Sequence, residues 1–263
     1  MDLQLKGKNA LITGASQGLG FATGRRLAIE GCNLVINSRN VTRLNEAVQR
    51  LQGEENIKAI GIPGDMTDPS FAIELIEKTE DVLGTVDLLV TNAGGPPAGK
   101  FEAFDDQTWQ HAVELSFLSH VRLIRAALPS LRKSTAPSVL TVTSITVKEP
   151  LPNLILSNSV RLATAGLTKS LAQELGPEGI RFNSILPGWT LTERVHNLIS
   201  QRAETNGTLP EEEFQKQTDA IPLRRMGTPE EFANAAAFLL SPVSSYITGV
   251  MLQVDGGLYR GTL

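Results

Sequence analysis

Three glycines, Gly14, Gly18 and Gly20, form the pattern that most clearly points to chemistry. They follow an apolar segment expected to be a strand and open a helix expected to run to about Glu30. Such a turn presents bare backbone N–H groups and the positive end of a helix dipole, which suit a pyrophosphate. We expect Gly14 to make the tight turn, Gly18 to admit the phosphate, and Gly20 to let the helix pack on the sheet. The spacing is G-x-x-x-G-x-G, so the flanking strand and helix, more than the glycines alone, favour nucleotide binding.

The rest of the chain alternates apolar strands with amphipathic helices. Near-continuously apolar strands indicate a parallel sheet covered by helices on both faces, so we predict one doubly wound α/β domain over residues 1–263. Ligands bind such sheets at the carboxyl ends of the strands. A polar segment at about 189–226 is expected to be irregular, with one helix, and to cover the substrate. Strands are expected at residues 9–13, 33–37, 57–61, 86–91, 138–143, 180–186 and 250–254, and helices at 41–52, 69–83, 105–131, 154–175, 211–219 and 228–240.

Composition restricts the class of protein. The 263 residues are 41% hydrophobic and 20% charged, as in an ordinary globular chain. A net charge of -4 argues against nucleic acid or an anionic membrane as partner. The start, Met1–Lys8, carries no secretory pattern, so we expect a cytoplasmic protein. The single Cys32 argues against a disulfide framework and a multi-cysteine metal site, and no metal is expected.

Together these motifs resemble the short-chain dehydrogenase/reductase family over nearly the whole chain. The resemblance implies a Rossmann-type fold and an oxidoreductase that acts on a hydroxyl or carbonyl group of a small molecule with a nicotinamide dinucleotide. It also implies a homotetramer or homodimer that assembles through the helices at 105–131 and 154–175. The matching motifs are Thr13–Gly20, Gly64-Asp65, Asn92-Ala93-Gly94, the strand ending at Ser144, Leu186-Pro187-Gly188, Thr248-Gly249 and Val254–Gly257.

The resemblance also assigns cofactor contacts. It places Asp65 and Met66 at the adenine, Asn92–Gly94 under the adenine ribose, and Pro187 and Gly188 beside the nicotinamide. For each of these, turn formation is the alternative explanation. The expected cofactor-binding residues are Gly14, Ser16, Gln17, Gly18, Leu19, Gly20, Ser38, Arg39, Asp65, Met66, Asn92, Ala93, Gly94, Pro187 and Gly188.

The end of the second strand indicates which dinucleotide binds. An acidic residue there would bind the adenosine ribose hydroxyls and repel a 2′-phosphate. The sequence has Ser38 and Arg39 instead, and the Arg39 guanidinium offers a fork of donors that matches phosphate. We therefore predict NADP(H) in preference to NAD(H). The alternative is that Arg39 is only a solvated surface side chain.

The positions expected to carry catalysis are altered. Catalysis in the family rests on a serine, a tyrosine about thirteen residues later and a lysine four beyond it. This chain has Ser144, then Ser157 and Arg161, with no tyrosine between residues 144 and 170; Ser116 stands where an asparagine is common. Arg161 keeps a positive charge and donors for ribose hydroxyls. A serine hydroxyl is a far weaker acid than a phenol, whose pKa is about 10, so Ser157 alone is not expected to deliver the proton.

Three functions remain open from these residues. In an oxidoreductase, another side chain, water or the substrate would handle the proton. Halohydrin dehalogenases also have arginine at the lysine position, but they keep the tyrosine and lack the glycine turn, so that reaction is not favoured. A non-catalytic NAD(P)-binding sensor or oligomer partner is the third function. The titratable alternatives for the proton are Lys148, Glu149, His111, His120 and His196.

The segment 156–162 is expected to begin the helix that faces the nicotinamide. Ser157, Asn158 and Arg161 can converge on one point because residues three and four apart share a helix face. Capping of the helix by Ser157 or Asn158 is the alternative. We expect residues 95–97 and 189–226 to shape the substrate pocket, although neither carries a signature of a particular substrate.

Overall fold

The computed structural model describes residues 1–54 and 57–262. Within them, a parallel sheet has the strand order β3-β2-β1-β4-β5-β6-β7. The order reverses direction between β1 and β4, which opens a crevice at the carboxyl ends of those two strands. This arrangement confirms the predicted single-domain, doubly wound fold. The strands are β1 Asn9–Ile12, β2 Asn33–Ser38, β3 Ala59–Pro63, β4 Leu88–Thr91, β5 Ser138–Val142, β6 Arg181–Pro187 and β7 Met251–Val254.

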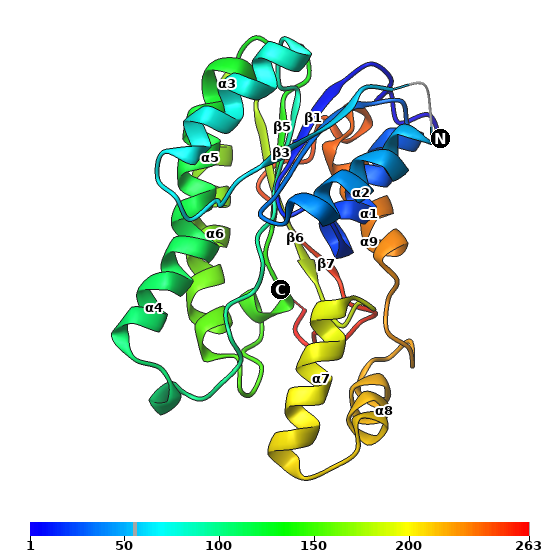
Figure 1. The fold of residues 1–263 in the computed structure, drawn as a ribbon. Coiled ribbons are helices and arrows are strands. Elements are labelled where there is room, and N and C mark those ends of the chain that lie inside the picture. Colours follow the sequence, from blue (N-terminus) through cyan, green and yellow to red (C-terminus); the bar gives the residue numbers. More distant parts are fainter. Residues whose placement is uncertain (55–56, 263) are drawn as a thin grey trace.

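Helices cover both faces of this sheet (Figure 1). Helices α1, α2 and α9 lie on one face and α3, α5 and α6 on the other, while α7 and α8 extend beyond the carboxyl ends of the strands. Alternate residues of β1 feed the two cores, with Ile12 buried toward α1 and Leu11 toward α3 and α5. The helices are α1 Gly18–Ile29, α2 Val41–Gln52, α3 Phe71–Leu83, α4 Asp106–Val113, α5 Ser119–Leu131, α6 Ile155–Glu174, α7 Glu193–Asn206, α8 Pro210–Ala220 and α9 Pro229–Leu240.

Two expectations about local structure are corrected. The segment before α8 is not irregular, because α7 occupies much of it. Thr192 caps that helix by accepting a hydrogen bond from the backbone N–H of Val195, and Ile199 and Ala203 continue its buried stripe. The helix expected over 105–131 contains a π-turn at Glu114–Leu118 between α4 and α5. Such turns are frequent near functional sites.

The glycine turn is attached to the end of β4. Gly14 has a φ of +58°, and a Cβ there would lie 2.8 Å from the carbonyl oxygen of Asn92. A Cβ on Gly20 would collide with the Gly14 carbonyl oxygen. The Asn92 side-chain amide donates to Gly14 O over 3.0 Å, and the Thr13 hydroxyl donates to Asn92 O over 2.8 Å. Glycine is therefore required at both positions for this close approach.

Among the residues that the structure describes, no helix has the length and apolar character needed to cross a membrane.

Candidate active site

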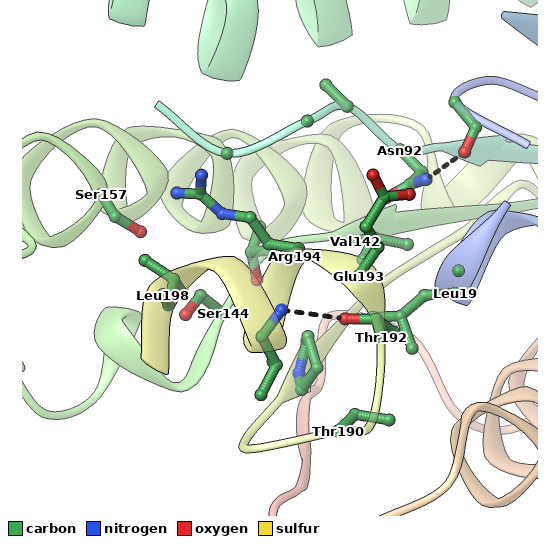
Figure 2. Close-up of a pocket in the computed structure, with 18 of the residues that line it drawn as sticks. Leu19, Asn92, Val142, Ser144, Ser157, Thr190, Thr192, Glu193, Arg194 and Leu198 are labelled. Atoms are coloured by element: carbon green, nitrogen blue, oxygen red, sulfur yellow. Dashed lines mark hydrogen bonds between the residues drawn. The ribbon is translucent and has the colours of Figure 1, made fainter. Parts of the chain in front are cut away.

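A cavity of about 430 Å³ opens at the carboxyl ends of β1, β4, β5 and β6. Figure 2 shows Leu19 and Asn92 toward one end of it and Ser157 and Leu198 toward the other. The three predicted catalytic residues line this one cavity, together with most of the predicted cofactor contacts. The predicted residues that line it are Gly14, Gln17, Gly18, Leu19, Asn92, Ala93, Gly94, Ser144, Ser157, Arg161, Pro187 and Gly188.

The other predicted cofactor residues lie outside the cavity lining. Gly20 packs beneath the turn against Gly14, and Met66 is buried beside a second, much smaller cavity. The hydroxyl of Ser16, in the glycine turn, lies 2.8 Å from the hydroxyl of Ser38, at the end of β2. Ser38 and the adjoining residues are thus placed beside the glycine turn, outside the main cavity.

Two arginines lie on the outer side of the glycine turn. The Arg39 side chain is 68% exposed, and its guanidinium is 3.5 Å from the Asp65 carboxylate. Burial acts to raise the pKa of Asp65, but hydrogen bonds from Thr67 and the charge of Arg39 lower it overall. Arg43, which the sequence reasoning missed, donates to the Gln17 side-chain oxygen over 2.8 Å. Its signal was available, since the first turn of a helix points long side chains back toward the preceding strand end.

Arg161 is the buried cation of the site, with 7% of its surface exposed. Its Nη1 donates to the carbonyl oxygens of Val142 and Thr143 over 3.2 and 2.9 Å, at the end of β5. Burial lowers the pKa of Arg161 to about 10, and the charge of Arg194 contributes. Those interactions orient the guanidinium with main-chain dipoles. A cation held by neutral carbonyls keeps a positive potential in the cavity.

Ser144 and Ser157 lie near each other through Thr146. The Thr146 backbone N–H donates to Ser144 Oγ over 3.2 Å, and the Thr146 hydroxyl is 3.2 Å from Ser157 Oγ. Both serines line the cavity, although Ser157 is only 9% exposed. The site therefore offers two hydroxyl groups beside one guanidinium.

Asn158 does not join this group. Its side chain hydrogen bonds to the backbone of Leu151, donating to the carbonyl over 2.9 Å and accepting from the N–H over 3.2 Å. The expected convergence of Ser157, Asn158 and Arg161 is thus wrong for Asn158. Helix α6 begins after Leu154 with no side-chain cap, so capping by Ser157 or Asn158 is also wrong.

None of the proposed alternative proton donors lines the cavity. Lys148 places its ammonium 5.5 Å from the ring centroid of Tyr259. His120 is buried, with Nδ1 2.6 Å from the Thr91 hydroxyl, and it lines the smaller cavity. Burial lowers the pKa of His120 to about 3, and the charge of Arg161 contributes, so the ring is neutral. Glu149, His111 and His196 are likewise absent from the residues that line the main cavity.

Helix α7 adds two charged residues that the sequence reasoning missed, Glu193 and Arg194. The Arg194 guanidinium donates to the Pro96 carbonyl over 2.6 Å and lies against Gly95, where burial lowers its pKa. In Figure 2 this group extends from α7 toward Ser157. The spacing of the buried residues of α7 could have predicted this helix, but most of its residues are polar, so the pattern was not recognised.

The residues fit a dinucleotide. Glycine at positions 14 and 20 lets the turn pack against Asn92, where a Cβ would collide with protein atoms, and the space beside Gly94 is open. One cavity connects this turn to Ser144 and Arg161. Backbone donors for phosphates and a cation with two hydroxyls thus face a shared space.

Comparisons with known proteins agree with this geometry. A family model described as Enoyl-(Acyl carrier protein) reductase matches residues 14–259. Tropinone reductase-like 3 of Erythroxylum coca is 32% identical, over 97% of this chain and 94% of its own.

Two solved structures resemble this chain in both fold and sequence. The L-sorbose reductase of Gluconobacter frateurii, complexed with NADPH and L-sorbose, has a TM-score of 0.94 and 31% identity, covering 99% of this chain and 100% of its own. An NADPH-bound short-chain oxidoreductase of Pseudomonas aeruginosa PAO1, described as containing an atypical catalytic center, has a TM-score of 0.88 and 30% identity, covering 97% and 98%. These relatives favour an oxidoreductase over a non-catalytic sensor. The chain belongs to the short-chain dehydrogenase/reductase family and is an oxidoreductase of that type.

Proposed function

We propose that the chain is an NADP(H)-dependent oxidoreductase that interconverts a carbonyl and a hydroxyl group of a small molecule. The observation that carries the proposal is the single cavity lined both by the glycine turn and by Ser144, Ser157 and Arg161. The predicted contacts of Gly14, Gly18 and the other cofactor-binding residues are part of the same proposal.

Preference for NADP(H) over NAD(H) rests on the outer side of the turn. The hydroxyls of Ser16 and Ser38 are paired there, Arg39 follows Ser38 in the chain, and Arg43 donates to the side chain of Gln17, which follows Ser16. A 2′-phosphate there would accept hydrogen bonds from all four side chains, and arginine forks match phosphate well. Each of these arginines also faces one carboxylate: Arg39 lies 3.5 Å from Asp65, and Arg43 lies 3.6 Å from Glu193. The NADPH bound to the Gluconobacter and Pseudomonas relatives supports the same choice.

The chemistry would differ from that of a tyrosine acid. The bound nicotinamide would supply or accept the hydride. Arg161 and the hydroxyls of Ser144 and Ser157 would donate hydrogen bonds to the substrate oxygen, whose negative charge grows during reduction. Among the lining residues that the structure describes there is no histidine, cysteine, lysine or tyrosine. The one acid among them, Glu193, lies 3.6 Å from the Arg43 guanidinium. We therefore propose that a water held by Ser157, whose hydroxyl can both donate and accept, passes a proton from bulk solvent to the oxygen, so that no hydroxide is left behind.

Assembly as a homotetramer or homodimer is a further part of the proposal. Leu162 on α6 and Phe101 before α4 are exposed to 54% and 68%. Leu162 lies in one of the two helices expected to form the subunit contact, and Phe101 shortly precedes the other. Pairing of the subunits there would remove this apolar surface from water.

A calorimetric titration with NADPH, NADP, NADH and NAD tests the cofactor. Micromolar binding of NADPH is expected, weakened at least tenfold, about 1.4 kcal/mol, by Arg39→Ala or Arg43→Ala, with NADH unaffected. The matched control is Arg50→Ala, because Arg50 is also on α2 but stacks on Phe21 with its guanidinium 4.1 Å from the ring centroid. Equal affinity of the wild-type chain for NADPH and NADH would refute the preference.

A further inference from the structure

Arg194 occupies an electrostatically unfavourable place. It is the second residue of α7, where the positive end of the helix dipole disfavours a cation. Its charge also contributes to the lowered pKa of Arg161, so the two guanidinium groups repel each other across the cavity. Arg194 is thus held near two other sources of positive potential.

The partners of the two arginines leave this positive charge uncompensated. The hydrogen bonds of Arg161 and Arg194 go to main-chain carbonyls: those of Val142, Thr143 and Gly94, and that of Pro96. Glu193 also lines the cavity, but its carboxylate lies 3.6 Å from the Arg43 guanidinium. In the part of the chain that the structure describes, no ion pair joins a carboxylate to either Arg161 or Arg194.

We propose that the substrate is an oxo acid or hydroxy acid whose carboxylate pairs with Arg194 while its reacting oxygen faces Ser144 and Ser157. A carboxylate accepts two hydrogen bonds from one guanidinium fork, and it would replace the neutral Pro96 carbonyl with a charged partner. The apolar side chains of Leu154 and Leu198 line the same region and would contact the carbon chain. This inference rests on the proposed function, since it names the substrate class of the same site.

The cofactor's own diphosphate is the competing source of negative charge. The backbone of the turn at Gly14–Gly18 already provides donors for that group. Arg194 instead lies against Gly95 and Pro96, beyond Gly94, and extends toward Ser157 (Figure 2). The placement favours the substrate.

The test compares reduction of 2-oxo and 4-oxo carboxylic acids of increasing chain length with reduction of their methyl esters, using NADPH. Wild-type chain should prefer at least one acid over its ester, and Arg194→Gln should raise KM for that acid about 10- to 100-fold while changing the ester's kcat/KM less than about threefold. Arg194→Lys should recover part of the preference, because it keeps the charge but not the fork.

Arg202→Gln is the matched control. Arg202 is also on α7, but its guanidinium stacks over Trp189, 4.9 Å from the ring centroid, and it does not line the cavity. Its removal should leave the acid-to-ester ratio unchanged, and the NADPH dissociation constant should stay within about threefold in all variants.

Three results would overturn the proposal. The first is equal kcat/KM for acids and esters in the wild-type chain. The second is weaker NADPH binding in Arg194→Gln with an unchanged acid-to-ester ratio, which would assign Arg194 to the cofactor. If no oxo compound is reduced, binding of the corresponding saturated carboxylates is measured by calorimetry. The third contrary result is that none of these carboxylates binds the chain, with or without NADP. Failure of the proposed function appears separately, as absence of NADPH binding by the wild-type chain.

Discussion

The two ends of the main cavity differ in which atoms line them, backbone at one end and side chains at the other. The end at Gly14–Gly20 is made mostly of backbone, fixed by the hydrogen bonds that tie the turn to Asn92. The opposite end is made of side chains from two elements: Ser144 follows β5, and Ser157 and Arg161 lie on α6. Backbone geometry constrains the first end to glycine, whereas side chains can be exchanged one at a time at the second.

This difference explains how one end can match its family while the other departs from it. Replacing a side chain in the reaction end changes the chemistry without disturbing the cofactor cradle. In this chain the hydroxyl of Ser157 stands at the position of the family's acidic phenol, and the buried guanidinium of Arg161, with a pKa of about 10, stands at the position of its lysine. We therefore expect stabilisation of charge, more than transfer of a proton from a side chain, to carry catalysis at this end.

Removing the cation of the reaction end should have the largest effect. Arg161→Met is expected to lower kcat by about 10²- to 10³-fold, as does loss of one oxyanion donor, because the developing negative charge loses its guanidinium. Arg161→Lys is the control that keeps the charge. Steady-state kinetics together with thermal unfolding separate this loss from misfolding, and kcat within threefold of the wild type in a folded Arg161→Met would contradict the assignment.

Adding one methyl group to the cofactor end should cost stability and binding together. In Gly20→Ala the new Cβ meets the Gly14 carbonyl, so we expect unfolding to become easier by about 1–3 kcal/mol and NADPH binding to weaken. Gly53→Ala after α2 is the matched control, since its added Cβ would meet no atom closer than the Arg50 carbonyl oxygen at 3.6 Å. It should raise the free energy of unfolding by about 0.4–1 kcal/mol. Urea unfolding measures the stability of each variant and NADPH titration measures its affinity. Similar values for the two variants would contradict the requirement for glycine at position 20.

His120 tests the region beneath the cofactor end, where it contacts Thr91. Its folded pKa of about 3 lies below the unfolded value near 6.5, so below pH 6.5 the unfolded chain binds the extra proton. The free energy of unfolding should therefore decrease as the pH is lowered, by about 2 kcal/mol between pH 7.5 and pH 5. His120→Gln should remove this part of the slope in urea unfolding. Parallel profiles for variant and wild type would show that His120 is not the group responsible.

The pH profile of catalysis should show the smallest effect. Because the lining residues include no histidine, cysteine, lysine or tyrosine among those described, kcat/KM should vary less than about threefold between pH 6 and pH 9. A fall is expected only as Arg161 loses its proton near pH 10. A profile that titrates sharply near neutrality in the wild type would indicate a side-chain acid outside this set.

The two ends also differed in how far the sequence could predict them. Gly14, Gly18 and Gly20 were interpretable because glycine spacing reports backbone geometry directly. Arg194 was missed because it lies on α7, whose few buried residues are diluted by polar neighbours. The direction of Asn158 toward Leu151 depends on a loop conformation that helical spacing does not encode. Side-chain direction and long-range contact therefore limited the prediction at the reaction end.

The most direct test of the central claim is a single-turnover experiment with the chain saturated by NADPH and mixed with the panel of oxo acids and their esters. We expect loss of nicotinamide absorbance with at least one compound, at a rate that falls at least about 100-fold in Arg161→Met. Tight NADPH binding with no oxidation by any compound would contradict it, and would identify a chain that binds the dinucleotide without catalysing hydride transfer.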